Sequence, residues 1–167
     1  MNTEELDRML RGNDATKDYY LGVYAADQLP KERIARDVWL LVCNCCPIDL
    51  PGEHWIAIFG NSRGDIDFFD SFGFPPNAYD GVHQFLERQE TSLIAYNTTH
   101  LQSIESDACG SYCLFFAYYR SLGRSMCDIV ADIIDGECKE RFINYILGMP
   151  RDEFVKFSVL NVIYASR

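Results

Sequence analysis

Hydrophobic positions in the first third of the chain predict one helix followed by extended segments. Apolar residues on one face indicate a helix between Thr3, which can cap it, and Gly12, which ends it. These apolar residues are Leu6, Met9 and Leu10. The segment "YYLGVYAAD" predicts an extended or turning stretch. The run "VWLLVCNCCPI", which begins at Val38 and is ended by Pro47, is apolar and β-rich and therefore predicts a buried strand.

Strands and helices alternate in the middle of the chain. "HWIAIFG" and "DIDFFDS" are two β-prone runs joined by "NSRGD", a connector rich in turn-forming residues, so together they predict a hairpin. "NAYDGVHQFLERQE" carries Val82, Phe85 and Leu86 at helical spacing. The segment "SLIAYN" after it predicts a further strand.

The chain is predicted to be helical from Ser106 onward. "CGSYCLFFAYYRSLG" predicts a helix that ends at Gly123, and "SMCDIVADII" opens with a cap formed by Ser125 and Asp128. "KERFINYILG" and "PRDEFVKFSVLNVIY" complete the helices, the second with Pro150 in its first turn. Because there is no internal repeat or linker, we expect one α+β domain over residues 1–167, with a small central mixed sheet flanked by helices.

Composition narrows the class of protein. The chain has 167 residues, of which 48% are apolar and 14% aromatic, enough for a core that needs no disulfide support. No apolar run approaches the ~18 residues of a membrane span, and the start "MNTEELDRMLRGND" is unlike a signal peptide. Seven cysteines without paired spacing favour free thiols in an intracellular, reducing compartment. A net charge of −10 argues against broad binding to a nucleic-acid backbone.

Cys109 is the first candidate for chemistry, because it lies at the start of a predicted helix. Free backbone N–H groups and the positive end of the helix dipole favour a thiolate there. Gly110 would let a substrate backbone approach closely and leaves the adjacent N–H groups open to an oxyanion. Taken alone, a cysteine before a helix is more typical of a small buried thiol. A nucleophile also needs an imidazole, an acceptor that orients it and oxyanion donors.

The three histidines give one clear candidate for the imidazole. His54 precedes Trp55 at a predicted strand start, where a cleft can form at the sheet edge. His83, inside a predicted helix, and His100, in a polar segment, are more typical of surface or structural histidines. Asp70 closes the strand that pairs with "HWIAIFG", so the hairpin should bring His54 and Asp70 together. In isolation, an aspartate there is more typical of a strand-ending turn.

Gln102 is the candidate oxyanion donor. It lies seven residues before Cys109, and its side-chain amide can donate to an oxyanion beside the Cys109 backbone N–H. A lone glutamine is ordinarily a solvated surface residue, so the prediction depends on the combination of His54, Asp70, Gln102 and Cys109.

The cysteine-rich segment "CNCCP" raises the question of a metal site. Its spacing does not match the paired Cys-x-x-Cys sets of structural zinc, and no second cluster accompanies it, so we expect no metal. Cys43 and Cys45 are instead predicted to be core residues. Cys113, one turn after Cys109, is also predicted to pack in the core.

The ordered set of His54-Trp55, Asp70 closing "FFDSFG", Gln102 and "ACG" at 108–110 resembles the adenovirus-type cysteine endopeptidases, the adenain family. The resemblance covers most of the chain and includes "YYLGVY", "PGEHWIAI", "GSYCLFF" and "YILGMP". The wider superfamily, which includes the SUMO-specific proteases, shares the His-Trp pair, the strand-end Asp and the Cys-Gly helix start. The gap from Gln102 to Cys109 is closer to the adenovirus type.

The resemblance implies the adenain-like fold and an endopeptidase that cleaves protein precursors at small, Gly-containing sites. His54 would be the base, Asp70 its orienter and Cys109 the nucleophile. Gln102 and the Cys109 N–H would form the oxyanion hole, with Gly110 and Trp55 at the substrate cleft. In viral relatives the precursors are capsid and core proteins, which implies virion maturation in an infected host cell and in the virion itself.

Two departures from the adenoviral pattern limit what the resemblance implies about cofactors. The adenoviral enzymes bind an activating peptide through a disulfide, but "QETSLIAYNT", near Thr91, has no cysteine, so any activating peptide would bind without that tether. They also use DNA as a cofactor, whereas this chain is acidic, so DNA activation is not expected. Two alternatives remain open. One is a ubiquitin-like-modifier isopeptidase that uses the same residues, and the other is an inactive binding module that retains the fold.

Overall fold

One mixed sheet forms the centre of the protein. The structure, a computed structural model, describes residues 1–136 and 162–166. The strands follow one another across the sheet in sequence order: β1 (Tyr20–Ala25), β2 (Val38–Asn44), β3 (Trp55–Asn61), β4 (Asp65–Phe69), β5 (Leu93–Asn97) and β6 (Val162–Ser166). β1 and β2 are parallel, as are β4 and β5, and the other neighbours are antiparallel. The prediction of an α+β fold with a central mixed sheet is confirmed.

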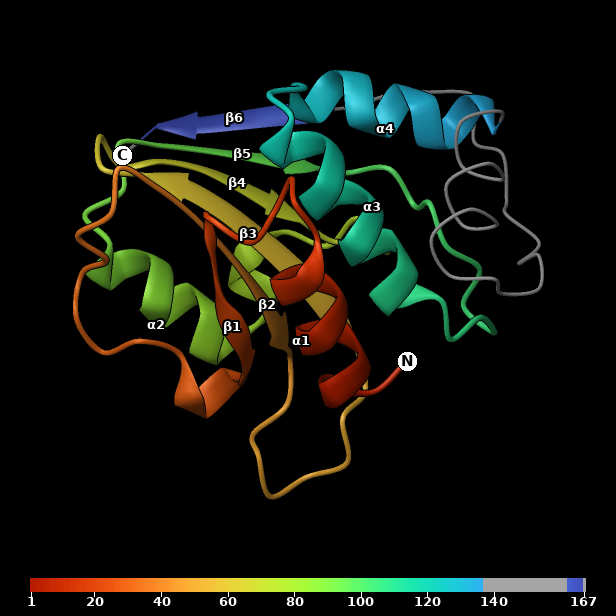
Figure 1. Ribbon diagram of the computed structural model, residues 1–167, viewed down its shortest axis with the longest axis horizontal. Coiled ribbons are helices and arrows are strands. Elements are labelled where there is room, and N and C mark those ends of the chain that lie inside the picture. The colour runs from red at the N-terminus through yellow and green to blue at the C-terminus, as the bar shows by residue number, and fades with distance from the viewer. Residues whose placement is uncertain (137–161, 167) are drawn as a thin grey trace.

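Helices cover both faces of the sheet (Figure 1). One face is packed by α1 (Thr3–Gly12), α3 (Cys109–Ser121) and α4 (Met126–Asp135). The other is packed by α2 (Asp80–Arg88), with the short 3-10 turns η1 (Ala26–Gln28) and η2 (Pro76–Ala78) nearby. Side chains of β2 alternate between these two cores, Leu40 and Val42 on one side and Trp39 and Leu41 on the other. Burial on both faces explains why the sequence of β2 is a continuous apolar run.

The hairpin of β3 and β4 is present as predicted. Its register pairs Ala57 with Phe69 and Gly60 with Ile66. In the connecting turn, the Asn61 side chain accepts hydrogen bonds from the backbone N–H groups of residues 63 and 65. Gly64 adopts φ +85°, and a Cβ there would lie 2.9 Å from the carbonyl oxygen of Glu90. Both conditions favour glycine at this turn.

Helix α3 places the candidate nucleophile. It begins at Cys109, later than the predicted start at Ser106, so the thiol still lies in the first turn, and its residues 109–117 are all buried. Phe116 stacks on Phe69 of β4, with ring centroids 4.8 Å apart and an interplanar angle of 7°. This contact fixes α3 across the sheet. None of the helices in the described part of the chain is long and apolar enough to cross a membrane.

The cap of α1 differs from the prediction. The N-cap is Asn2 and not Thr3, because Asn2 forms a capping box with Glu5. The Asn2 side chain accepts from the Glu5 backbone N–H at 2.9 Å, and the Glu5 carboxylate accepts from the Asn2 N–H at 2.9 Å. Two otherwise unpaired backbone donors are satisfied in this way, which a cap at Thr3 would not achieve.

The prediction of a helix through "PRDEFVKFSVLNVIY" is wrong at its end. Residues 162–164 belong to β6, which pairs antiparallel with β5. Val, Ile and Tyr are β-prone, and their pairing covers β5, which would otherwise be an open sheet edge. The earlier part of this segment and all of "KERFINYILG" lie outside the described residues.

Candidate active site

His54 and Asp70 meet at the end of the hairpin. His54 immediately precedes β3 and Asp70 immediately follows β4. Extending the register that pairs Ala57 with Phe69 places His54 and Asp70 diagonally across the two strands, on the same face. His54 Nε2 lies 2.7 Å from Asp70 Oδ1, and the side chains are 6% and 0% exposed. The structure therefore brings the two residues together as the hairpin prediction requires.

Asp70 is held by residues that the sequence did not indicate. Its Oδ1 also accepts from the Phe72 backbone N–H at 2.7 Å, and its Oδ2 accepts from the Tyr79 hydroxyl at 2.7 Å. Asn97, at the end of β5, accepts from the Asp70 N–H at 3.1 Å and donates to the Asp70 carbonyl at 2.6 Å. The one available signal was that Asn97 is a polar residue ending a strand next to β4. Tyr79 is brought in by the tertiary fold alone.

The imidazole of His54 has two distinct sides. Nε2 is bound to Asp70, while Nδ1 is buried and makes no hydrogen bond of standard geometry among the described residues. The imidazole also interacts with the Cys109 thiol, which raises the pKa of His54. The Phe72 ring packs on the imidazole with centroids 4.5 Å apart, which limits rotation of the imidazole. Hydrogen bonds between catalytic groups are often long before substrate binds and then shorten.

Cys109 lies in an environment that favours its thiolate. It is 7% exposed, and burial alone would raise the pKa of its thiol. Interaction with His54 and hydrogen bonds from the backbone N–H groups of Trp55 and Gly110 outweigh burial, so the pKa of Cys109 is lowered. Burial likewise opposes a charged His54, but Asp70 and Cys109 raise the pKa of the imidazole to about 9. Both shifts favour the thiolate form of Cys109 and the imidazolium form of His54.

Gln102 is buried, unlike an ordinary surface glutamine. It is 1% exposed, and its Oε1 accepts from the Ser71 hydroxyl at 2.8 Å. Its Nε2 donates to the Ser106 carbonyl at 2.6 Å, and its backbone N–H donates to the Ser71 carbonyl at 3.1 Å. These bonds place Gln102 between the residue that follows Asp70 and the loop that leads into α3. One amide hydrogen is engaged by Ser106, so a role at an oxyanion would use the second.

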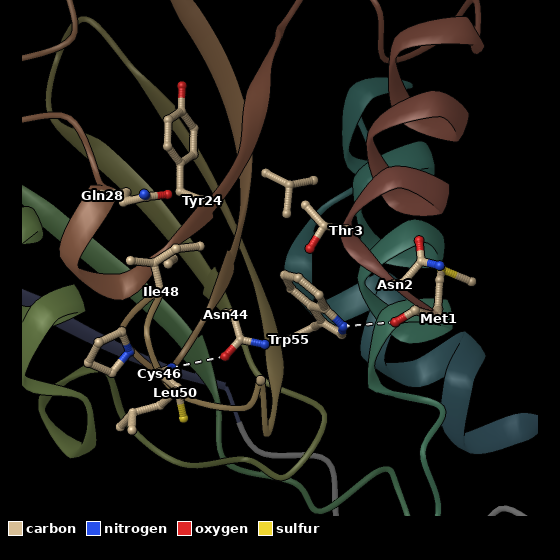
Figure 2. Close-up of a pocket in the computed structure, with 14 residues that line it drawn as sticks. Met1, Asn2, Thr3, Tyr24, Gln28, Asn44, Cys46, Ile48, Leu50 and Trp55 are labelled. Atoms are coloured by element: carbon tan, nitrogen blue, oxygen red, sulfur yellow. Dashed lines mark hydrogen bonds between the residues drawn. The ribbon is translucent and has the colours of Figure 1, made fainter.

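Trp55 and Met1 line one pocket, and Gly110 lies beside Met1. The Trp55 indole donates to the Met1 carbonyl at 3.2 Å, and a Cβ at Gly110 would lie 3.1 Å from the Met1 side chain. Figure 2 shows Trp55 and Met1 at one wall of a pocket of about 410 Å³. Ile48 and Leu50, which are 57% and 58% exposed, form part of its lining. Nothing in the sequence predicted that Met1 would lie at this pocket.

The remaining histidines lie outside this site. His83 is exposed on α2, with its Nε2 3.7 Å from a Glu87 carboxylate oxygen one turn away. His100 packs edge-on against Phe72, with ring centroids 5.5 Å apart. Both positions agree with the predicted surface and structural roles.

The other cysteines differ in burial. Cys43 and Cys113 are fully buried, as predicted. Cys45 is half-exposed, so its predicted place in the core is wrong, because β2 ends at Asn44 and Cys45 already belongs to the following loop. Within residues 1–136, Cys45, Cys46 and Glu53 form a group of ligand-type side chains close enough to share a metal ion.

Comparisons with known proteins give a structural alignment over part of the chain. No protein-family model and no curated protein sequence matches the chain. A crystal structure of the selenomethionine form of the ASFV pS273R protease aligns with a TM-score of 0.39 and 24% sequence identity. The alignment covers 66% of this chain and 44% of that protein's chain. The chemistry of the site is therefore assigned from the geometry of this chain's own residues.

Proposed function

We propose that the protein is a cysteine endopeptidase of the adenain family, within the superfamily that also includes the SUMO-specific proteases. One observation supports this most directly. A buried imidazole is held by a carboxylate at 2.7 Å and interacts with a thiol at the first residue of a buried helix. Nucleophile, base and orienter come from three separate elements, and a purely structural cysteine needs neither partner.

Acylation begins with the ion pair. The Cys109 thiolate attacks the carbonyl carbon of the scissile peptide bond and forms a C–S bond, while the carbonyl oxygen takes up the electron pair and becomes an oxyanion. The first-turn backbone N–H of Cys109 and the second amide hydrogen of Gln102 stabilise that charge. The His54 imidazolium then gives its proton to the leaving amine, the C–N bond breaks and a thioester remains on Cys109.

Deacylation uses the same residues in reverse. Neutral His54 removes a proton from a water molecule as its oxygen attacks the thioester carbonyl. The C–S bond breaks, the substrate's new carboxyl group leaves, and Cys109 and His54 return to the ion pair. Asp70 orients the imidazole through Nε2 and is itself held in place by the Phe72 backbone N–H and the Tyr79 hydroxyl.

The proposed substrates are protein precursors with small, Gly-containing cleavage sites. The closeness of Met1 to Gly110 and Trp55 supports this choice, since it leaves little space beside Gly110 for a bulky substrate side chain. Ile48 and Leu50 give the adjoining pocket an apolar wall for a residue farther along the substrate. We further propose maturation of virion proteins as the biological role, in an infected cell and in the particle, on the family resemblance.

The proposed enzyme needs no metal or organic cofactor for turnover, because the thiolate, imidazolium and carboxylate supply the chemistry. Activation by DNA is not part of the proposal, since the chain carries a net charge of −10. A peptide activator, if one exists, would bind without a disulfide at the position near Thr91, whose side chain is buried and hydrogen-bonded to the Leu86 carbonyl.

Covalent labelling tests the proposal. A peptide vinyl sulfone ending in glycine should modify Cys109 at neutral pH, and the label should be lost in both Cys109→Ala and His54→Ala. Cys127→Ser, which alters a half-buried thiol on α4, is the matched control and should label normally. Labelling of all four proteins alike, or of none, would refute the proposed enzyme, and the second result is the one that an inactive binding module predicts.

The substrate class is tested with the same purified protein. Cleavage of Gly-containing peptides and precursor fragments should be faster than cleavage of ubiquitin-fused or SUMO-fused reporters. The opposite ranking would identify a ubiquitin-like-modifier isopeptidase with the same catalytic residues. Cleavage by Cys109→Ala at the normal rate would exclude both activities.

A further inference from the structure

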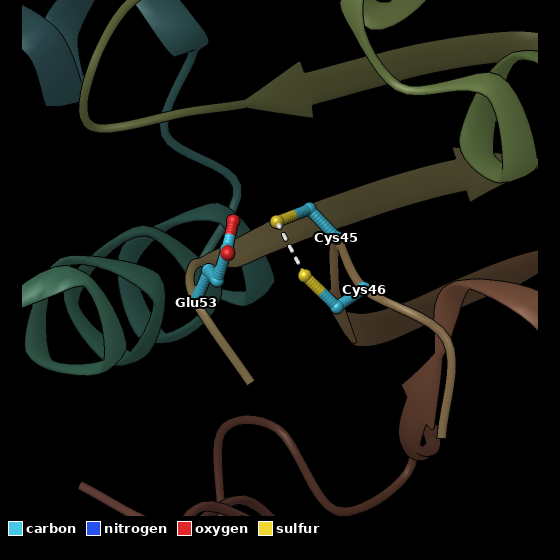
Figure 3. A group of neighbouring side chains, drawn as sticks. All are labelled: Cys45, Cys46 and Glu53. Atoms are coloured by element: carbon cyan, nitrogen blue, oxygen red, sulfur yellow. Dashed lines mark hydrogen bonds between the residues drawn. The ribbon is translucent and has the colours of Figure 1, made fainter. Parts of the chain in front are cut away.

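Cys45, Cys46 and Glu53 converge outside the candidate active site. Their ligand atoms all lie within 4.8 Å of one another, and the two sulfurs are 3.9 Å apart. Figure 3 shows the two thiols and the carboxylate turned toward one another at the open end of β2 and β3. We call these three residues the dithiol cluster.

The strand register explains why the fold assembles this group. β2 and β3 pair antiparallel, with Cys43 opposite Ile56 and Asn44 opposite Trp55. Beyond the last paired residues, the Cys45 backbone N–H donates to the His54 carbonyl at 2.9 Å, so the two chains are still side by side. The same register continued by one more step places Cys46 opposite Glu53. The sequence spacing of "CNCCP" could not show the third ligand, because it arrives from the other strand.

We propose that the dithiol cluster is a binding site for a thiophilic divalent cation of the Zn²⁺ class. Two thiolates and one carboxylate, with solvent in the fourth position, form a ligand set typical of zinc. In a tetrahedral site with Zn–S bonds of about 2.3 Å, two sulfurs are about 3.8 Å apart. The observed separation is 3.9 Å, so the thiols already stand at the spacing that a shared zinc ion requires.

Glu53 is the ligand whose side chain would move when an ion binds. Glu53 is exposed, whereas Cys45 and Cys46 are half-buried and held by the backbone. The Cys46 backbone N–H donates to the Asn44 side chain at 3.0 Å, which fixes the turn that carries both thiols. Glu53 can therefore swing toward a bound ion without moving the strands.

Solvent has access to the dithiol cluster. All three residues line a cavity of about 880 Å³. Charged side chains of both signs share that lining: Asp27, Lys31, Asp80 and Arg88. A hydrated cation can reach the thiols through this cavity and exchange its waters there, and coordination would release the proton of each thiol. The ion would join the start and end of the loop between β2 and β3.

The test uses the 167-residue chain carrying Cys109→Ala under reducing conditions, so that neither the proposed nucleophile nor a disulfide competes for metal. Titration with Cd²⁺ should give thiolate-to-metal charge-transfer absorption that saturates at one ion per chain. Competition with Zn²⁺ should remove the signal. Adding Cys46→Ser should weaken Cd²⁺ binding by at least about 100-fold, because even groups outside the ligand shell affect metal affinity by about 10–100-fold.

Glu53→Gln and Cys127→Ser complete the test. Glu53→Gln should keep the absorption band and weaken binding about 10-fold or more, and since Glu53 is exposed it decides the question even if a cysteine variant does not fold. Cys127→Ser should bind as the parent protein does. No charge-transfer band in the parent, equal affinity after changing both Cys45 and Cys46 to Ser, or loss of binding in Cys127→Ser would each overturn the proposal.

Discussion

Asp70→Asn is the substitution that most directly probes the proposed catalytic geometry. The change keeps the size of the side chain and an oxygen acceptor but removes the negative charge next to His54 Nε2. The pKa of His54 is about 9 instead of 6.5, a preference for the imidazolium of roughly 3 kcal/mol. Burial alone would lower that pKa, so Asp70 and Cys109 together supply more than this difference.

Removing the charge should shift the pH dependence in a definite direction. In the proposed mechanism, activity requires deprotonated Cys109 and protonated His54, so it should be lost as pH rises through the pKa of His54, near 9. In Asp70→Asn, burial still disfavours the imidazolium while its hydrogen-bonded carboxylate is gone. The alkaline limb should therefore move to lower pH, and kcat/KM at neutral pH should fall roughly 10²- to 10⁴-fold.

The assay compares two readouts across pH, kcat/KM on a Gly-containing peptide and the rate of Cys109 alkylation by iodoacetamide. Asp67→Asn is the matched control. Asp67 lies on β4, the strand that Asp70 immediately follows, but it pairs with Arg120 at 2.5 Å and not with His54. That control should lower stability and leave both pH profiles unchanged. An alkaline limb that stays near 9 in Asp70→Asn would refute the assignment of Asp70 as the group that holds the imidazolium.

Three further substitutions test parts of the same framework. Gln102→Ala should lower kcat by about 10²- to 10³-fold with little change in KM, as expected for an oxyanion donor, and steady-state kinetics showing only a raised KM would contradict that role. Asn97→Ala should lower the free energy of unfolding in urea by roughly 1–3 kcal/mol, because the buried backbone groups of Asp70 lose their hydrogen-bond partner. An unchanged urea midpoint would argue against a stabilising role for these two hydrogen bonds. Gly64→Ala should lower the free energy of unfolding by roughly 1–3 kcal/mol through backbone strain at φ +85°, while kcat/KM of the folded protein stays the same.

The hairpin shows why part of the site was predictable from sequence. Turn-forming residues and β-prone runs fix where the chain reverses, and the reversal alone determines which strand ends meet. His54 and Asp70 stand at those ends, so their meeting follows from local signals. Cys109 at the first residue of α3 is also a local property, because it depends on where one helix begins.

Features that depend on tertiary contacts were not predictable in the same way. Tyr79, at the start of α2, donates to the Asp70 carboxylate, and the Ser71 hydroxyl donates to Gln102, which is 31 positions away in sequence. Residues 162–164 were predicted to be helical as the end of a longer segment, yet these β-prone residues complete the sheet by pairing with β5. Asn2 displaced Thr3 as a cap because reciprocal bonding with Glu5 satisfies two donors at once.

The proposed catalytic site and the dithiol cluster share one structural origin and remain chemically separable. Both arise where β2 and β4 end and β3 begins, and the hydrogen bond from the Cys45 backbone N–H to the His54 carbonyl joins them. The position of the His54 ring, however, is set by Asp70 at Nε2 and by the Phe72 ring, which packs on it at an interplanar angle of 34°. A cation at the dithiol cluster would thus stabilise the loop before His54 without changing the charge that faces its imidazole. Metal occupancy should consequently affect the stability of the folded enzyme more than the pH at which Cys109 and His54 ionise.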